Sequence, residues 1–159
     1  GTGNMKFMLN GAVTLGTYDG ANVEIVAEAG EENNYIFGAR VEDIEKIQRE
    51  YKGSAVAEAN KDLMRVVSSL IDGTFDNDGS GDFEDLYNSL MKERDTYFVL
   101  EDFMAFREAE DKVFAAYKDQ KSWAKMSLMN IAHAGIFSSD RTIMQYANEI
   151  WDIAPCTTK

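Results

Sequence analysis

The first six residues, Gly1-Thr2-Gly3-Asn4-Met5-Lys6, place two glycines and a lysine at the start of a predicted helix. Glycines let several backbone N–H groups approach an anion, and the N-terminus of a helix adds a favourable dipole. The amine of Lys6 could neutralise a phosphate or attack an aldehyde. These residue types therefore suit a phosphorylated aldehyde cofactor. A P-loop of the usual kind is excluded, because the Gly-Lys-Ser/Thr triplet of that motif is absent.

The residues around Lys6 leave two interpretations open. Met5, Phe7, Met8 and Leu9 make the helix too apolar for a solvated terminus, and a reactive Lys6 would have to be buried among Met5, Phe7 and Met8. Burial would lower the pKa of its amine and favour the neutral, nucleophilic form. From these residues alone, however, a lysine beside an apolar helix is more often a surface charge.

A second pattern, Asp76-Asn77-Asp78-Gly79-Ser80-Gly81-Asp82-Phe83, resembles the first part of a calcium-binding loop between two predicted helices. Oxygen-bearing side chains stand at loop positions one, three and five, and glycine stands at position six. Position twelve is Tyr87, where an EF-hand requires a bidentate glutamate. The segment is therefore interpreted either as an incomplete calcium site or as an acidic turn before the next helix.

Other candidates for chemistry are weaker. His133 is the only histidine and lies on a predicted helix, where a packed or half-exposed side chain is the simplest interpretation. The chain has one histidine, one cysteine (Cys156) and no Cys-x-x-Cys pair, so we predict no zinc site and assign no residue as a metal ligand. A Ser–His–Asp triad has no nucleophile-elbow pattern to support it.

The elements that would position Lys6 are predicted to be α/β first and helical afterwards. Residues 13–17 and 34–37 are short, β-branched or aromatic runs that predict strands, each ending near a glycine. Helical spacing of apolar residues between and after them gives a strand–helix–strand–helix order, which is typical of a parallel sheet. The further predicted helices cover residues 55–71, 83–91, about 100–117, 123–134 and 140–151, the last with Ser138 or Ser139 as N-cap.

Length and charge exclude several function classes. The 159 residues suffice for one domain with a buried core, and no apolar run is long enough to span a membrane. A net charge of −12 argues against a nucleic-acid partner or an acidic membrane surface. A single cysteine excludes an internal disulfide and fits a reducing cytosol.

Several motifs, in order along the chain, resemble the α-glucan (glycogen, starch and maltodextrin) phosphorylases. The resemblance rests on Gly1-Thr2-Gly3-Asn4-Met5-Lys6-Phe7-Met8-Leu9-Asn10-Gly11, Thr17-Tyr18-Asp19-Gly20-Ala21-Asn22-Val23-Glu24-Ile25, Glu31-Glu32-Asn33, Ile36-Phe37-Gly38, Arg40-Val41-Glu42-Asp43 and Phe137-Ser138-Ser139-Asp140-Arg141-Thr142-Ile143. Residues 53–98 match only loosely. The first of these motifs is similar to the pyridoxal-phosphate signature of that family.

The resemblance implies a place in a longer protein. Residues 1–159 would be the C-terminal part of the pyridoxal-phosphate-binding domain, the Rossmann-like C-terminal domain of a GT-B glycosyltransferase. The N-terminal domain and the start of this domain would then be absent. The parent would be a cytoplasmic, allosteric, homodimeric enzyme of glycogen catabolism, with no nucleic-acid or membrane partner.

The resemblance also implies roles for the first residues. Lys6 would form the Schiff base with pyridoxal 5′-phosphate and would be the catalytic residue. Thr2 and Gly3 would hold the cofactor phosphate, and Gly1 would face the substrate. The reaction would be phosphorolysis of an α-1,4-glucan by inorganic phosphate to give glucose 1-phosphate. We expect the isolated chain to be inactive and to bind the cofactor weakly or not at all, because the rest of the site is missing.

Two alternatives of other classes stay open. One is a calcium-responsive helical interaction module that uses residues 76–87. The other is a nucleotide-sugar glycosyltransferase of similar architecture, which would leave Lys6 unmodified.

Overall fold

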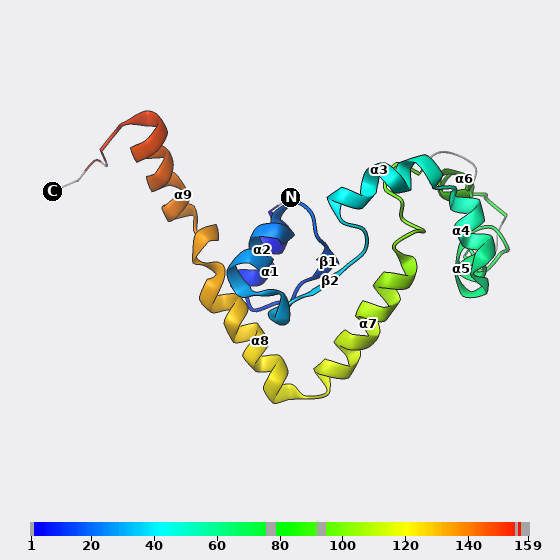
Figure 1. The fold of residues 1–159 in the computed structure, drawn as a ribbon, viewed down its shortest axis with the longest axis horizontal. Coiled ribbons are helices and arrows are strands. Elements are labelled where there is room, and N and C mark those ends of the chain that lie inside the picture. Colours follow the sequence, from blue (N-terminus) through cyan, green and yellow to red (C-terminus); the bar gives the residue numbers. More distant parts are fainter. Residues whose placement is uncertain (1, 76–78, 92–94, 155, 157–159) are drawn as a thin grey trace. The chain divides into compact units, whose positions relative to one another are not determined.

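The computed structural model describes residues 2–75, 79–91, 95–154 and 156. In this part of the chain, α/β structure comes first and helices follow (Figure 1). The elements are α1 (Gly3–Leu9), β1 (Leu15–Thr17), α2 (Ala21–Ala29), η1 (Glu31–Asn33), β2 (Tyr35–Phe37), α3 (Val41–Glu50), α4 (Gly53–Ala59), α5 (Lys61–Ser68), α6 (Glu84–Met91), α7 (Phe103–Tyr117), α8 (Gln120–His133), η2 (Ala134–Phe137), α9 (Ser139–Tyr146) and η3 (Ala147–Trp151).

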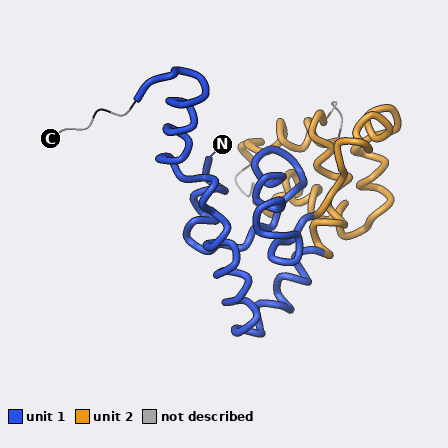
Figure 2. Tube along the Cα trace, turned by 60° about the vertical axis from the view of Figure 1, so that its left-hand side comes forward, with its two compact units in different colours: residues 1–36, 109–159 blue, residues 37–108 orange. Residues whose placement is uncertain are grey.

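The chain divides into two compact units (Figure 2). Unit 1 combines Gly1–Ile36 with Ala109–Lys159, and unit 2 is Phe37–Glu108. Unit 1 therefore contains both the predicted cofactor motif and the C-terminal helices. Each unit has its own cluster of buried apolar side chains.

The predicted α/β start of the chain is confirmed, with shorter strands than expected. β1 and β2 form a parallel two-stranded sheet, and α2 connects them. Beside β1, the carbonyl oxygen of Thr14 accepts a hydrogen bond from the Tyr35 backbone N–H at 2.8 Å. Helix α2 ends where predicted, because Gly30 adopts a φ of 87° that favours glycine over other residues.

The core of unit 1 joins α1 and α2 to η2. Met8, Ile25, Ala29 and Ala134 are each at most 4% exposed, and Phe137 packs against them. Asn130 of α8 adds a polar link, since its Nδ2 donates to the carbonyl oxygen of Asn33 at 2.9 Å. Because Met8 belongs to this buried cluster, it attaches α1, the helix that carries Lys6, to unit 1.

Unit 2 is built from helices around Ala57, Leu63, Val67 and Leu100. The predicted helix over residues 55–71 is instead two helices, α4 and α5, divided at Asn60. Its predicted end is also wrong. Helix α5 stops at Ser68, and the next apolar residues, Leu70 and Ile71, lie in a turn. Asn60 explains the division, since its side chain caps α5 by accepting hydrogen bonds from the backbone N–H groups at 62 and 63.

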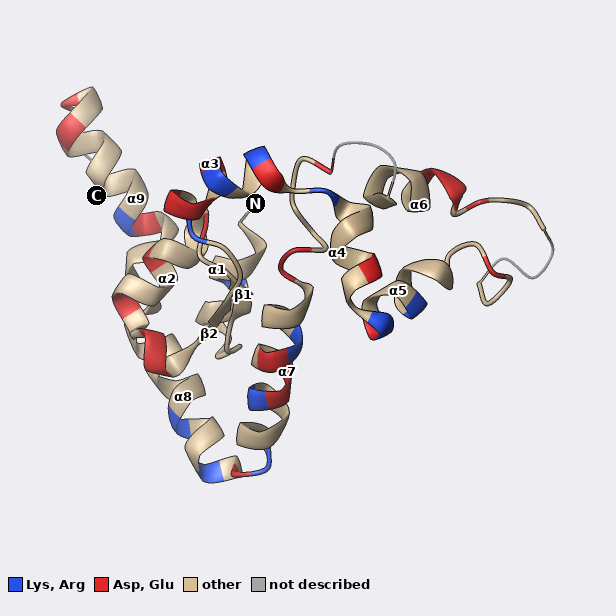
Figure 3. Cartoon of the chain, turned by 45° about the vertical axis from the view of Figure 1, so that its right-hand side comes forward, with Lys and Arg blue, Asp and Glu red and all other residues tan. Residues whose placement is uncertain are grey.

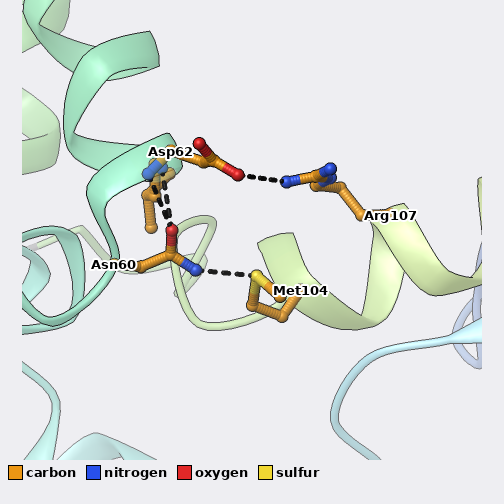
Figure 4. A network of polar contacts seen from close by, with 5 residues as sticks. Asn60, Asp62, Met104 and Arg107 are labelled. Atoms are coloured by element: carbon orange, nitrogen blue, oxygen red, sulfur yellow. Dashed lines mark hydrogen bonds and ion pairs between the residues drawn. The ribbon is translucent and has the colours of Figure 1, made fainter.

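Polar contacts tie the start of α5 to α7 within unit 2 (Figure 4). Asn60 donates through Nδ2 to the sulfur of Met104 at 2.8 Å. Asp62 and Arg107 form an exposed ion pair with an N···O distance of 3.0 Å. One asparagine therefore both starts α5 and contacts α7.

The last predicted helix is two elements. Ser138 is the N-cap residue of α9 but its side chain makes no capping bond there. The helix widens into the π-helical η3 from Ala147, and Asp152 ends it in the left-handed conformation. Trp151 stacks on Tyr146 at 5.5 Å between ring centroids and is 52% exposed. Within the described residues, no helix combines the length and apolar character needed to cross a membrane.

Candidate functional site

Three of the four predicted site residues lie at the start of α1, with Thr2 as its N-cap residue and Gly3 and Lys6 inside the helix. The backbone N–H of Lys6 bonds to the carbonyl oxygen of Thr2 at 3.3 Å, which places the two residues one helical turn apart. Gly3 precedes Lys6 by three residues and lies on the same face of the helix. Thr2, Gly3 and Lys6 are all exposed. Gly1, the predicted substrate-binding residue, lies outside the described residues.

Lys6 is a surface residue in this chain, as its residue type alone predicts, and lacks the burial that a cofactor role would require. Met8 is fully buried, but Phe7 is 67% and Leu9 is 43% exposed, and Lys6 itself is exposed. The reason is that α1 presents only one face to the core of unit 1. Successive residues of a helix are rotated by about 100°, so Lys6 lies roughly opposite the face formed by Asn4 and Met8.

The exposed face has the donors that a phosphorylated aldehyde requires. Lys6 supplies an amine and is the only ionisable residue of α1, whereas Asp and Glu occur on α2 and α7 (Figure 3). Gly3 stands in the first turn, where backbone N–H groups have no partner within the helix. A Cβ at Gly3 would meet no heavy atom within 4 Å, so its backbone is open to a ligand. The residues present therefore fit pyridoxal phosphate chemically.

Two asparagines beneath this face were not singled out from the sequence. Asn4 of α1 donates to Asn22 of α2 at 3.0 Å, and Asn22 donates to the carbonyl oxygen of Thr17 at 2.9 Å. Both lie in the motifs quoted for the family resemblance, but their pairing spans 18 positions. Local periodicity carries no signal for such a contact.

The candidate calcium loop gains no support. Asp76, Asn77 and Asp78 lie outside the described residues. Tyr87, at the position of the required glutamate, packs against the buried cluster of unit 2. Among the residues that the structure describes, no group of three or more His, Cys, Asp or Glu side chains is placed to hold a metal ion.

His133 is a half-buried residue of α8, as predicted from the sequence. Its Nδ1 lies 2.9 Å from the carbonyl oxygen of Met129, one turn earlier in the helix. A carbonyl can only accept, so Nδ1 carries the hydrogen in this contact.

A cavity of about 890 Å³ lies within unit 2, outside the candidate site. Lys46, Tyr51, Asn60 and Asp102 are among its lining residues. Asp102 accepts a hydrogen bond from the backbone N–H of Ala39 at 2.9 Å, so part of this polar lining already holds the turn after β2. None of the predicted site residues lines the cavity.

Comparison with known proteins gives one consistent result. The family model for carbohydrate phosphorylase matches residues 1–153. Glycogen phosphorylase of Bacillus subtilis (strain 168) is 41% identical over 157 residues, which cover 98% of this chain and 20% of that protein. The muscle form of glycogen phosphorylase from Homo sapiens is 49% identical over 156 residues, 98% of this chain and 18% of that protein. The chain thus spans about one fifth of the length of these relatives.

Proposed function

Because this chain belongs to the carbohydrate phosphorylase family, we propose that it is the C-terminal part of the cofactor-binding domain of an α-glucan phosphorylase. The observation that carries the proposal is the family match over residues 1–153, which includes the exposed face of α1. In this proposal the parallel strands belong to the Rossmann-like C-terminal domain of a GT-B enzyme. The relatives described above are named glycogen phosphorylases, which favours this function over that of a nucleotide-sugar glycosyltransferase.

The proposed reaction is the phosphorolysis of α-1,4-glucan. Inorganic phosphate takes the terminal glucosyl unit, the glycosidic C–O bond breaks, and glucose 1-phosphate leaves with a shortened glucan. The leaving glucan oxygen needs a proton. The substrate phosphate and the phosphate group of the cofactor must therefore be held close together in a fixed orientation. When bound, pyridoxal 5′-phosphate would supply a phosphate group that exchanges a proton with the substrate phosphate.

The residues of this chain bind and orient in that proposal. Lys6 would hold the cofactor through its aldehyde carbon as a Schiff base, with release of water, and so fix the position of the cofactor ring. The Thr2 hydroxyl and the Gly3 backbone N–H would hold the cofactor phosphate, and Gly1 would face the substrate. The positions of Thr2, Gly3 and Lys6 on one side of the start of α1 are compatible with one ligand, since Thr2 and Gly3 lie four and three residues before Lys6.

The whole protein has further proposed properties. It is an allosteric homodimer in the cytoplasm, and its partners are glucan, inorganic phosphate and glucose 1-phosphate. The exposed, unpaired Cys156 fits a reducing compartment. The isolated 159-residue chain is expected to be inactive, because two adjacent phosphates require several cations and Lys6 is already committed to the cofactor.

The test is covalent trapping of the cofactor in the full-length protein. Borohydride reduction in the presence of pyridoxal phosphate should add the cofactor mass to the peptide that contains Lys6. Lys6→Met should abolish the label and the phosphate-dependent release of glucose 1-phosphate. Lys125→Met is the matched control, because Lys125 is an exposed lysine on α8. A full-length Lys6→Met protein with undiminished turnover would refute the proposed function.

A further inference from the structure

A chain of three amide hydrogen bonds connects β1 to the first turn of α1. Asn22 Nδ2 donates to the carbonyl oxygen of Thr17 at 2.9 Å. Asn22 Oδ1 accepts from Asn4 Nδ2 at 3.0 Å, and Asn4 Oδ1 accepts from the backbone N–H of Met5 at 3.0 Å. Each asparagine thus donates once and accepts once in the series. An aspartate at position 22 could accept from Asn4 but could not donate to Thr17.

The turn between β1 and α2 is shaped to hold Asn22 in this place. A Cβ at Gly16 would stand 2.7 Å from Asn22 Nδ2, so a larger residue there would displace the amide from this position. The backbone N–H of Asn22 bonds to the carbonyl oxygen of Asp19 at 3.1 Å. Gly20, just before α2, has a φ of 47°. The backbone N–H of Asn22 is thus held by Asp19, and its side-chain amide by the carbonyl oxygen of Thr17.

Asn4 and Met8 attach α1 to unit 1 along one face. They are four residues apart, so their side chains project from the same side of the helix. Met8 is fully buried beside Ile25 and Ala29, while Asn4 is half-buried against Asn22. An apolar contact alone permits a helix to rotate or slide by small amounts. The directional bonds of Asn4 restrict those movements, and they act two residues before Lys6.

We propose that Asn22 and Asn4 are positioning residues for Lys6. They fix the rotation of α1, so that Thr2, Gly3 and Lys6 face the same ligand. This inference rests on the proposed function, because it concerns the placement of the amine toward pyridoxal phosphate. Neither asparagine is assigned any contact with the cofactor.

The experiment uses full-length protein with Asn4→Ala, Asn22→Ala and the double variant. Each single variant removes two of the three bonds, including the Asn4–Asn22 bond that both variants share. Each should raise the dissociation constant for pyridoxal phosphate about tenfold, as expected for the loss of that shared bond. It should also slow borohydride trapping at Lys6. The double variant should resemble the single ones, because both changes break the same series of bonds.

Asn34→Ala is the matched control. Asn34 is a buried asparagine of unit 1 whose side chain bonds to the backbone at Thr14 and Gly30, away from α1. Its loss should lower the unfolding temperature at least as much as Asn22→Ala, without a change in the dissociation constant for the cofactor. Hydrogen exchange at Met5 and Lys6 in the 159-residue chain gives a readout without cofactor. Asn22→Ala should accelerate exchange there, and Asn34→Ala should not.

Two outcomes would overturn the inference. One is strictly additive effects of Asn4→Ala and Asn22→Ala on cofactor binding. The other is cofactor binding and trapping in Asn22→Ala equal to those of Asn34→Ala. Failure of the proposed function is distinguishable, since the unmodified full-length protein would then show no borohydride-dependent label at Lys6.

Discussion

Replacing Tyr51 with phenylalanine should destabilise unit 2 by removing one hydroxyl. That hydroxyl donates to the Asp95 carboxylate at 2.9 Å, and Asp95 is only 8% exposed. The ring itself stays in contact with Phe98, whose centroid lies 5.2 Å away in an edge-on arrangement. Tyr51→Phe therefore changes one polar contact and leaves the apolar packing in place.

The expected loss is about 1.5 kcal/mol of unfolding free energy. Hydrogen bonds to charged groups contribute about 1.5–3 kcal/mol. The lower end applies because Asp95 keeps hydrogen bonds from the backbone N–H groups of Tyr97 and Val99, at 2.9 and 2.7 Å. Tyr51 is also only partly buried, so water can replace some of the lost contact.

The assay must report on unit 2. Trp123 and Trp151 both belong to unit 1, so tryptophan fluorescence would follow the wrong unit. Urea unfolding of the 159-residue chain should instead be followed by far-ultraviolet circular dichroism, with hydrogen exchange at residues 95–100. Tyr97→Phe is the matched control, because Tyr97 is 83% exposed. We expect a change below about 0.5 kcal/mol for that control.

The same contact predicts a dependence on alkaline pH. Burial and then the hydrogen bond to Asp95 raise the pKa of Tyr51 well above its ordinary value of 10. A raised pKa in the folded state contributes stability that is fully present below pH 10 and is lost as the pH rises beyond it. The wild-type chain should thus lose stability above pH 10 more steeply than Tyr51→Phe, by at most about 1.4 kcal/mol per pH unit. Parallel pH profiles, or an equal loss in Tyr97→Phe, would refute this account of Tyr51.

Two further predictions concern the core of unit 2 and the start of α8. Leu63→Ala should cost about 2–5 kcal/mol, because Leu63 is 2% exposed at the centre of the unit 2 cluster; unchanged hydrogen exchange at Ala57 and Val67 would contradict this. Asp119 caps α8 through Ser122, and hydrogen bonds from the Ser122 hydroxyl and backbone N–H lower the pKa of Asp119. The stabilisation of α8 by the ionised Asp119 should be fully present above the ordinary pKa of aspartate. It should disappear as the pH falls through the lowered pKa of Asp119. Amide exchange in α8 should therefore increase on acidification, and Asp119→Ala should show that increase already at neutral pH.

The α/β order could be predicted because local sequence determines it. The apolar spacing of residues 23–29 and the glycine at position 30 predict α2, and α2 ends there in the structure. Helix α7 starts three residues later than expected, which is an ordinary boundary error. The end of α5 was missed because Leu70 and Ile71 continue the apolar period without continuing the helix. The π-helical turn at Ala147 has no comparable signal in its residue types.

The packed face of α1 could not be predicted from periodicity. Met5, Met8 and Leu9 share one face at i, i+3 and i+4, but Phe7 lies outside it, and the spacing does not show that Met8 is buried while Leu9 is exposed. Asn4 resolves the choice through Asn22, a contact that depends on the β1–α2 turn and the space beside Gly16. The outward position of Lys6 is therefore a tertiary property.

The two faces of α1 explain how this chain can build only one side of the proposed site. Asn4 and Met8 contact the rest of unit 1, whereas Lys6 and the large apolar side chains of Phe7 and Leu9 are exposed. A lysine that must react as a neutral amine needs an environment that excludes water. The chain spans about one fifth of the length of its relatives. Under the proposed function, other parts of the full-length protein would cover Lys6 and exclude water from it. Phe7 and Leu9 then provide the apolar surface that the cover buries, while Asn22 keeps Lys6 at a fixed rotation before the cofactor binds.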